Sequence, residues 1–260
     1  MTITKTTYGK LPAIQINSPD GAQAIVTLYG AHLVSWKTRD GKERIFVSSQ
    51  SSLDGSRAIR GGVPVIFPQF AERGDGMRHG FARVSHWREG ASRTIGGDAY
   101  CEFDLDAGDL PPGIAAAWPY GFALTLRVTV GAESLQLSLD VRNTGNERFD
   151  FAAALHTYYL VEEGAGAKVT GLEATPLVVG DKIDRIYRHI GAPIGLNGMK
   201  LEQAGFRDAV LWNPGPADAA KLADLGDDEW RRFVCIEPAT VDQMPLLPGE
   251  TWSGRHTITA

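Results

Sequence analysis

Residues 122–141 read FALTLRVTVGAESLQLSLDV, and this stretch decides the fold class because its apolar and polar residues alternate. Alternation with a period of two places successive side chains on opposite faces, which is typical of a half-buried β-strand. Residues 122–130 and 135–141 both follow this pattern, and residues 131–134 between them have the composition of a hairpin loop. The stretch therefore predicts two neighbouring antiparallel strands.

Similar patterns occur along most of the chain. They predict further strands at residues 13–17, 22–28, 32–37, 44–47, 81–87, 100–105, 149–157, 209–212, 233–237 and 251–259. Helix signals are few, and the clearest predicts a short helix at residues 218–225, with Asp218 as its N-cap. Because the strands do not alternate with helices, we expect an all-β fold, a large antiparallel β-sandwich with few short helices. No repeat or linker divides the sequence, so we expect a single domain over residues 1–260.

The composition excludes several classes of protein. The chain has 260 residues, with 26 Lys and Arg against 31 Asp and Glu, which gives a net charge of −5. A broad nucleic-acid-binding surface normally needs an excess of basic residues, so we expect no nucleic-acid partner. The longest uncharged run, residues 110–126, contains three prolines and is unsuited to a membrane helix. Two cysteines cannot form a disulfide framework, and no signal-peptide pattern is found, so we expect a soluble cytoplasmic protein and, by default, a monomer.

Several catalytic and cofactor signatures are missing from the sequence. It contains no phosphate-binding Gly-Lys-Ser/Thr loop, no paired-glycine dinucleotide turn and no Gly-x-Ser-x-Gly nucleophile motif. The six histidines show no close paired spacing of the kind that binds metals. We therefore expect a protein without metal or nucleotide cofactors.

His156 follows a predicted strand that could form the floor of a pocket. A period of two places its imidazole on the same face as Ala152 and Ala154, whose small side chains leave room above them. The alternative is a buried histidine that bonds to the backbone for structural reasons.

Glu237 ends the apolar run of residues 233–236 and precedes Pro238. A buried carboxylate costs several kcal/mol unless it is paired or hydrogen-bonded, so its position indicates either a cavity rim or a strand end that has reached solvent. If the two side chains meet, a histidine that donates a proton and a glutamate that accepts one could move protons across a small substrate without a cofactor.

Arginines and glycines form a third candidate site. Arg60 precedes two glycines, and Arg78, His79 and Arg83 lie within the segment MRHGFAR of residues 77–83. Guanidinium groups bind phosphate oxygens, and neighbouring glycines let backbone N–H groups approach an anion. Converging arginines would bind a phosphate even in an acidic protein, whereas isolated ones are ordinary surface residues.

Four ordered motifs together resemble the hexose-6-phosphate mutarotases (glucose-6-phosphate 1-epimerases) of the aldose 1-epimerase superfamily. They are RGGVPVIFPQ at residues 60–69, HGFAR at 79–83, LHTY at 155–158 and CIEP at 235–238, within a similarity that spans about residues 29–252. The resemblance implies a galactose-mutarotase-like β-sandwich with a sugar cleft on one sheet. It also implies interconversion of the α and β anomers of a hexose 6-phosphate, glucose 6-phosphate above all, without a cofactor.

The resemblance also implies roles for individual residues. His156 and Glu237 match the catalytic histidine and glutamate, and Arg60 and Arg83 match the arginines that bind the substrate phosphate. By a looser alignment, Asp181 resembles the sugar-binding aspartate, and His79 is expected in the wall of the cleft.

The sequence departs from the family pattern near His79. Arg78 stands where the family often has glutamine, and residues 71–76 (AERGDG) replace a common Phe-Gly opening. Arg78 could therefore strengthen phosphate binding or admit another anionic group. Two alternatives stay open, which are a non-catalytic carbohydrate-binding or regulatory β-sandwich and a mutarotase of neutral aldoses.

Overall fold

The computed structural model describes residues 2–162 and 166–260 and consists mainly of antiparallel β-sheets. The strands are β1 (Ile3–Tyr8), β2 (Leu11–Asn17), β3 (Gln23–Thr27), β4 (His32–Lys37), β5 (Val65–Ile66), β6 (Arg88–Ile95), β7 (Asp98–Asp106), β8 (Phe122–Val130), β9 (Ser134–Asn143), β10 (Phe149–Leu155), β11 (Tyr158–Leu160), β12 (Ala167–Thr170), β13 (Leu177–Val179), β14 (Ile183–Tyr187), β15 (Ile194–Leu196), β16 (Met199–Ala204), β17 (Asp208–Asn213), β18 (Phe233–Leu246) and β19 (Thr251–Thr259). The helices are α1 (Pro112–Ala117) and α2 (Gly215–Ala219), with 3-10 turns η1 (Ala82–Val84), η2 (Ala107–Asp109) and η3 (Glu229–Arg232). The predicted antiparallel β architecture with few short helices is confirmed.

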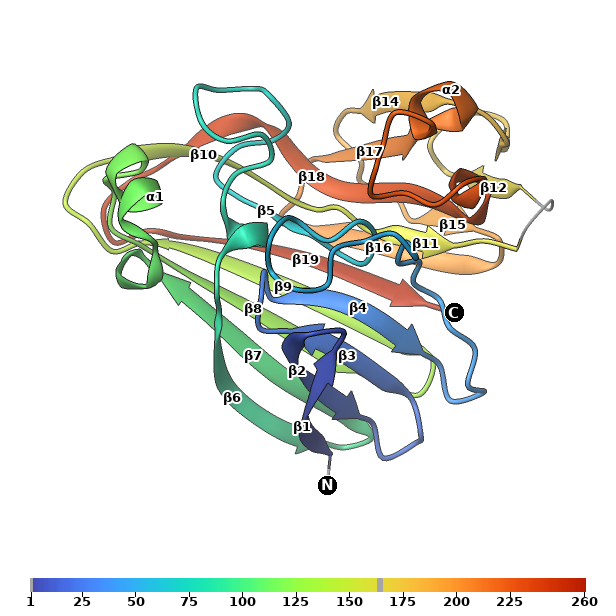
Figure 1. The fold of residues 1–260 in the computed structure, drawn as a ribbon, viewed down its shortest axis with the longest axis horizontal. Coiled ribbons are helices and arrows are strands. Elements are labelled where there is room, and N and C mark those ends of the chain that lie inside the picture. Colours follow the sequence, from blue (N-terminus) through green and yellow to red (C-terminus); the bar gives the residue numbers. More distant parts are fainter. Residues whose placement is uncertain (1, 163–165) are drawn as a thin grey trace.

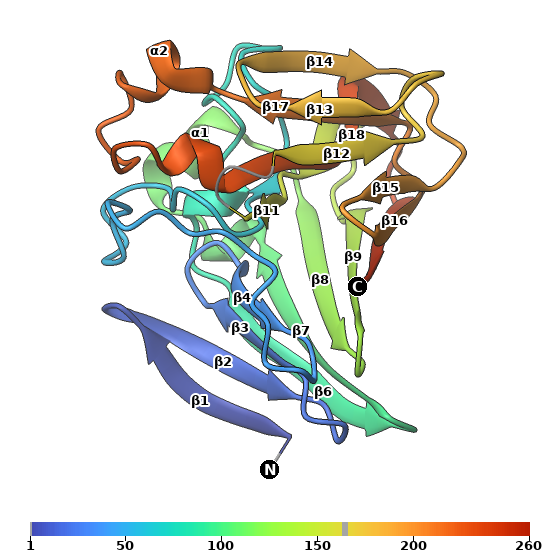
Figure 2. The same cartoon turned by 90° about the vertical axis from the view of Figure 1, so that its right-hand side faces the viewer.

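The described residues form three sheets (Figure 1). The largest has the order β13-β12-β15-β16-β19-β9-β8-β7-β6, and the sheet that carries the candidate site has the order β14-β17-β18-β10-β5, with β11 also paired to β18. A smaller sheet, β1-β2-β3-β4, lies beside β6 and β7 (Figure 2). Among the described residues, no helix has the length and apolarity needed to cross a membrane.

The predicted hairpin of residues 122–141 is confirmed as β8 and β9, whose inward side chains are fully buried. These side chains belong to the main hydrophobic core, which also receives Phe151, Ala153 and Leu155 from β10. The intervening Ala152 and Ala154 belong to a separate apolar cluster on the other face of β10. One face of β10 is thus packed against the core, while the other is available for a site.

Three local predictions from the sequence are wrong. The helix predicted at residues 218–225 is α2, which begins at Gly215, between two prolines, and ends at Ala219. Asp218 does not cap it, because its carboxylate contacts the ammonium groups of Lys182 and Lys221, each at 2.6 Å. Residues 81–87, predicted as a strand, form the turn η1 and an isolated bridge, and residues 44–47 make only isolated bridges.

The strand that carries Glu237 does not stop at Pro238 but continues to Leu246. Proline normally breaks a central strand because it cannot donate a ladder hydrogen bond. Here the neighbouring strand is interrupted after Leu155, and the carbonyl of Leu155 accepts a hydrogen bond from the N–H of Thr157 at 2.8 Å. Leu155 lies opposite Pro238 in the register, and its carbonyl is hydrogen-bonded even though Pro238 has no N–H to offer.

Candidate functional site

The interruption between β10 and β11 places His156 next to Glu237. Both strands pair with β18, through Ala154 with Ala239 and through Tyr158 with Cys235. The two pairings share one register, which puts residue 156 opposite residue 237. His156 Nε2 lies 3.3 Å from Glu237 Oε1, and both side chains are almost completely buried.

Burial changes the proton affinity of both groups in opposite directions. Loss of hydration raises the pKa of Glu237 well above its ordinary value, and the carboxylate of Asp184 adds to this shift. Burial also lowers the pKa of His156 well below its ordinary value, helped by His79, Arg83 and Arg60. Each shift favours the uncharged form, in which Glu237 carries a proton and His156 does not. In the free cleft the proton of the pair therefore lies on Glu237, and the charged form of the pair arises when that proton moves to His156.

Two polar atoms of this pair make no hydrogen bond to any described residue. They are Nδ1 of His156 and Oε2 of Glu237, both of them buried. Buried polar atoms normally have partners, and each exception calls for an explanation, such as a catalytic role or the binding of a ligand. The pair therefore combines a shared proton with unused hydrogen-bonding capacity.

The pair lies in a cleft of about 540 Å³. The cleft is lined by Arg57, Ala58, Ile59, Arg60, Pro64, Phe70, Ala71, Arg73, Arg78, His79, Arg83, His156, Tyr158, Asp184, Ile186, Val210, Trp212, Leu222, Asp224 and Glu237. The structure thus brings together six of the seven residues expected from the sequence. The volume is within the range of small-molecule sites.

Asp181 is the expected residue that the structure places elsewhere. It lies before β14 and lines a different depression, together with Trp230 and Arg231. Two aspartates line the cleft, Asp184 within β14 and Asp224, and Asp184 is the nearer of them to Asp181 in the sequence. Asp184, three positions after Asp181, is therefore a second candidate for the sugar-binding aspartate.

His79 lies in the cleft wall with its ring edge-on to that of His156, at 5.5 Å between ring centroids. Its Nδ1 accepts a hydrogen bond from the N–H of Ala71 at 3.2 Å. Burial and the nearby charges of Arg83, Arg78 and Arg60 lower the pKa of His79 to about 3. The imidazole is therefore neutral near pH 7, with its proton on Nε2, where it can donate to a ligand.

The arginines of the cleft differ in how they are paired. Arg60 contacts the carboxylate of Asp224 at 3.2 Å, and Arg78, which is exposed, contacts Glu72 at 3.3 Å. Arg83 has no carboxylate partner among the described residues, and its Nη2 donates to the carbonyl of Arg78 at 2.9 Å. The pKa of Arg83 is lowered by burial and by the charges of Arg60 and Arg78. The cleft therefore contains a concentrated positive charge that favours an anionic ligand.

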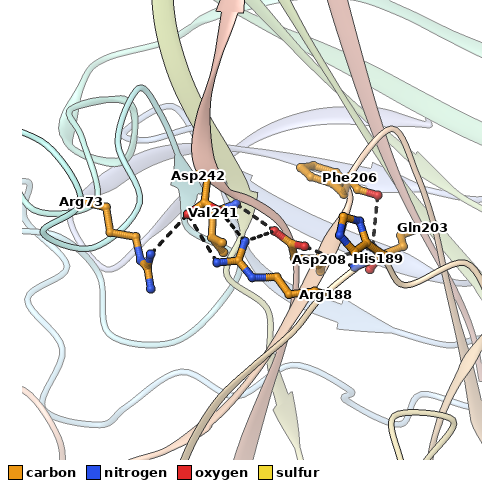
Figure 3. A network of polar contacts seen from close by, with 8 residues as sticks. All are labelled: Arg73, Arg188, His189, Gln203, Phe206, Asp208, Val241 and Asp242. Carbon is orange, nitrogen blue, oxygen red and sulfur yellow. Dashed lines mark hydrogen bonds and ion pairs between the residues drawn. The ribbon is translucent and has the colours of Figure 1, made fainter.

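An ionic network ties the loop before His79 to the strands beside the cleft (Figure 3). Arg73, which lines the cleft, lies 3.3 Å from Asp242 on β18. Arg188 contacts Asp242 at 2.7 Å and the buried Asp208 of β17 at 3.1 Å. The loop, the segment after β14 and two strands of the sheet are thus joined by charge pairs.

Sequence reasoning missed Asp184, Trp212 and Asp224 as residues of the cleft. Asp184 and Trp212 are partners in the pairing of β14 with β17, but residues 183–187 carried no clear strand signal. Asp224 lies in a turn whose residues were predicted to be helical. Period-two alternation could have indicated Trp212, whereas nothing in the sequence indicates Asp224.

Within the described parts of the chain, no group of three or more His, Cys, Asp or Glu side chains is arranged to hold a metal ion.

Comparison with known proteins gives consistent results. The family model described as aldose 1-epimerase matches residues 12–183. A protein of Cenchrus ciliaris named "Putative glucose-6-phosphate 1-epimerase" is 30% identical over 99% of this chain and 87% of its own length. A protein of Escherichia coli with the same name is 30% identical over 95% of this chain and 90% of its own length.

Solved structures agree in fold. YeaD of Salmonella typhimurium, described as a "putative mutarotase", superposes with a TM-score of 0.86 at 26% identity, covering 99% of this chain and 93% of that chain. A galactose mutarotase-like protein of Clostridium acetobutylicum shares the fold, with a TM-score of 0.76 at 16% identity over 98% of this chain and 97% of that chain. The expected galactose-mutarotase-like type of β-sandwich is confirmed.

Proposed function

The chain belongs to the aldose 1-epimerase family, and from this premise we propose that it interconverts the α and β anomers of a hexose 6-phosphate. Membership makes it an isomerase-type enzyme, a sugar mutarotase. Glucose 6-phosphate is the proposed substrate because it stands in the names of the relatives and because the cleft holds arginines suited to a phosphate.

The proposed reaction opens and closes the pyranose ring. Glu237, as carboxylate, takes the proton of the anomeric hydroxyl while His156, as imidazolium, protonates the ring oxygen. The bond between the anomeric carbon and the ring oxygen breaks, and the electron pair of the O–H bond forms the aldehyde. Rotation about the adjacent carbon–carbon bond presents the other face of the carbonyl, and reclosure returns both protons. Burial favours the uncharged pair, which is the state of these residues in the open-chain intermediate.

Other side chains of the cleft are proposed to bind the substrate. Arg60 and Arg83 hold the phosphate, and Arg78 adds positive charge at the exposed edge. Asp184 accepts hydrogen bonds from sugar hydroxyls, and His79 donates through Nε2 to a sugar oxygen.

One observation carries this proposal. An imidazole and a carboxylate 3.3 Å apart share a cleft with arginines, two of which, Arg57 and Arg83, have no carboxylate partner among the described residues. A mutarotase of neutral aldoses would gain nothing from this positive charge, which favours a phosphorylated substrate.

The test is magnetisation-exchange NMR of anomer interconversion with glucose 6-phosphate, galactose 6-phosphate and glucose. We expect fastest exchange with glucose 6-phosphate, and a loss of about 10²–10⁴-fold in Glu237→Gln and in His156→Asn. Glu162→Gln, an exposed glutamate that contacts Lys42, is the matched control and is expected to keep full activity. Near-native exchange in a folded Glu237→Gln variant would refute the catalytic assignment, and equal rates for glucose and its phosphate would refute the substrate.

A further inference from the structure

Arg60 is held on two sides by groups that belong to the cleft. Its Nε donates to Asp224 Oδ1 at 3.2 Å, its Nη2 lies 3.2 Å from the same oxygen, and its Nη1 donates to the hydroxyl of Tyr158 at 3.1 Å. A guanidinium has five N–H groups, so these contacts leave donors of Nη1 and Nη2 for a ligand. The contacts fix the plane of the guanidinium while keeping part of its donor set free.

The two partners are themselves fixed by the fold. Tyr158 lies in β11, and its ring is stacked on that of His156 with an interplanar angle of 11°. Asp224 precedes the buried Leu225, which packs in the same apolar cluster as Tyr158. Neither partner is a freely moving surface side chain, and the carboxylate side chain of Asp224 is only 17% exposed.

The backbones of Arg60 and of the Asp224 turn are attached to one segment. The N–H of Ser48 donates to the carbonyl of Arg60 at 3.0 Å, and the N–H of Arg60 donates to Ser51 Oγ at 2.9 Å. The buried carboxylate of Glu229 accepts from Ser48 Oγ at 2.6 Å and from the N–H of Gly226 at 2.9 Å. The Arg60–Asp224 contact is therefore anchored at both ends and built into the fold.

Two functions are conceivable for this carboxylate. It could compete with a phosphate for Arg60, or it could orient Arg60 for the phosphate. Asp224 would compete effectively with a phosphate only if it neutralised the positive charge of the cleft. Positive charge remains, however, because Arg83 has no carboxylate partner within the described ranges and Arg57 also lines the cleft. Asp224 also uses a single oxygen on one side of the guanidinium, which leaves other N–H groups unoccupied. The geometry therefore favours orientation.

We propose that Asp224 is a positioning residue that, with Tyr158, aligns Arg60 for the phosphate of the substrate and so sets the preference for phosphorylated sugars. This inference rests on the proposed function, since it concerns the same anion. Fixing a long side chain before the ligand arrives removes an entropic cost from binding. The effect should therefore be seen in KM for the phosphorylated substrate and not in the chemistry at the anomeric carbon.

The experiment compares Asp224→Ala and Asp224→Asn with Asp227→Asn, an exposed aspartate in the same turn region. We expect KM for glucose 6-phosphate, and the inhibition constant of inorganic phosphate, to rise about 3- to 10-fold in both Asp224 variants. The value of kcat and all constants for glucose should stay within about twofold, and Asp227→Asn should behave like the native protein. Tyr158→Phe, which keeps the stacked ring but removes the acceptor, should raise the same KM.

The double variants decide whether the effect passes through Arg60. In an Arg60→Ala background, Asp224→Asn should cause no further rise in KM, because the group that it positions is gone. A lower KM for glucose 6-phosphate in Asp224→Asn would show competition and overturn the inference, as would equal effects on glucose and its phosphate. If Asp224→Ala does not fold, the nearly isosteric Asp224→Asn decides the question.

The same data separate the inference from the proposed function. A phosphate-specific loss in Arg60→Ala without one in Asp224→Asn would overturn the positioning role and leave the phosphate pocket intact. Equal effects of Arg60→Ala on glucose and glucose 6-phosphate would refute the phosphate pocket itself, and the positioning role with it.

Discussion

Replacing Arg83 by methionine should separate substrate preference from stability. Arg83 lines the cleft, its Nε is buried without a hydrogen bond to any described residue, and Nη2 alone donates to the carbonyl of Arg78. Burial and the positive charges of Arg60 and Arg78 lower the pKa of Arg83, which means that placing this cation in the cleft costs free energy. Methionine keeps much of the aliphatic stem and removes the charge.

The magnitude follows from the contacts that are lost and gained. Hydrogen bonds to charged groups contribute about 1.5–3 kcal/mol, so loss of one guanidinium–phosphate contact should lower kcat/KM for glucose 6-phosphate about 10- to 150-fold. An unsatisfied buried donor costs about 1–3 kcal/mol, and the lost bond to Arg78 offsets about 1 kcal/mol of that gain. The free energy of unfolding should therefore stay constant or rise by up to about 2 kcal/mol.

The assays are exchange NMR with glucose 6-phosphate and with glucose, and urea unfolding followed by circular dichroism. Arg93→Met, an exposed arginine on β6, controls for the loss of one positive charge from the whole protein. Arg83→Met should lose the preference for the phosphorylated sugar, while its turnover of glucose should stay as in the native protein. A variant that keeps this preference, or one that loses more than about 1 kcal/mol of stability, would refute the reasoning, because Arg83 would then serve the fold.

Three further predictions concern histidine, aspartate and glycine. Burial lowers the pKa of His256 to about 4. Between pH 6.5 and 4 this histidine is therefore protonated in the unfolded chain but not in the native protein. The free energy of unfolding should fall as the pH drops through this range, by about 2 kcal/mol between pH 7.5 and 5. Urea unfolding should show a smaller drop in His256→Gln, and equal drops would contradict this origin. Asp184→Asn should lower kcat/KM for glucose 6-phosphate about tenfold in the exchange assay, whereas Asp181→Asn should not, and the reverse order would restore the original alignment. Gly80→Ala should lose about 2 kcal/mol or more in urea unfolding, since φ is 67° and its Cβ would lie 2.0 Å from the carbonyl oxygen of Phe67; native stability would show that the loop can rearrange.

The sequence was sufficient where one local rule decided the structure. The β8–β9 hairpin follows from alternation alone, because each of its inward residues enters a fully buried core. The same rule assigned the two faces of β10 and hence the face on which His156 lies. Motif resemblance then pointed to five of the six expected residues that line the cleft, and the sixth, Arg78, was noticed as a departure from the family pattern.

The sequence was insufficient where distant segments decide the structure. Pro238 reads as a strand end, yet the interruption opposite it removes the need for a donor at this position. Asp181 and Asp184 are three residues apart in a segment with weak strand signal, and only the pairing of β14 with β17 shows which of them reaches the cleft. Asp224 enters the site through a turn held by Glu229 and Ser48, a contact between residues far apart in the chain.

The charges of the cleft link phosphate binding to acid catalysis. Arg60 and Arg83 both lower the pKa of His156, and a bound phosphate dianion opposes their effect. In the complex with glucose 6-phosphate, His156 should therefore bind its proton more tightly than in the complex with glucose, which suits the imidazolium that opens the ring. When the His156–Glu237 pair takes up a second proton, Glu237 is no longer available as a base and kcat falls. The bound phosphate raises the pKa of this step, so the acid limb of the kcat profile should lie at higher pH for glucose 6-phosphate than for glucose. Superimposable pH profiles of kcat for the two sugars would show that the arginines bind the phosphate without influencing the acid.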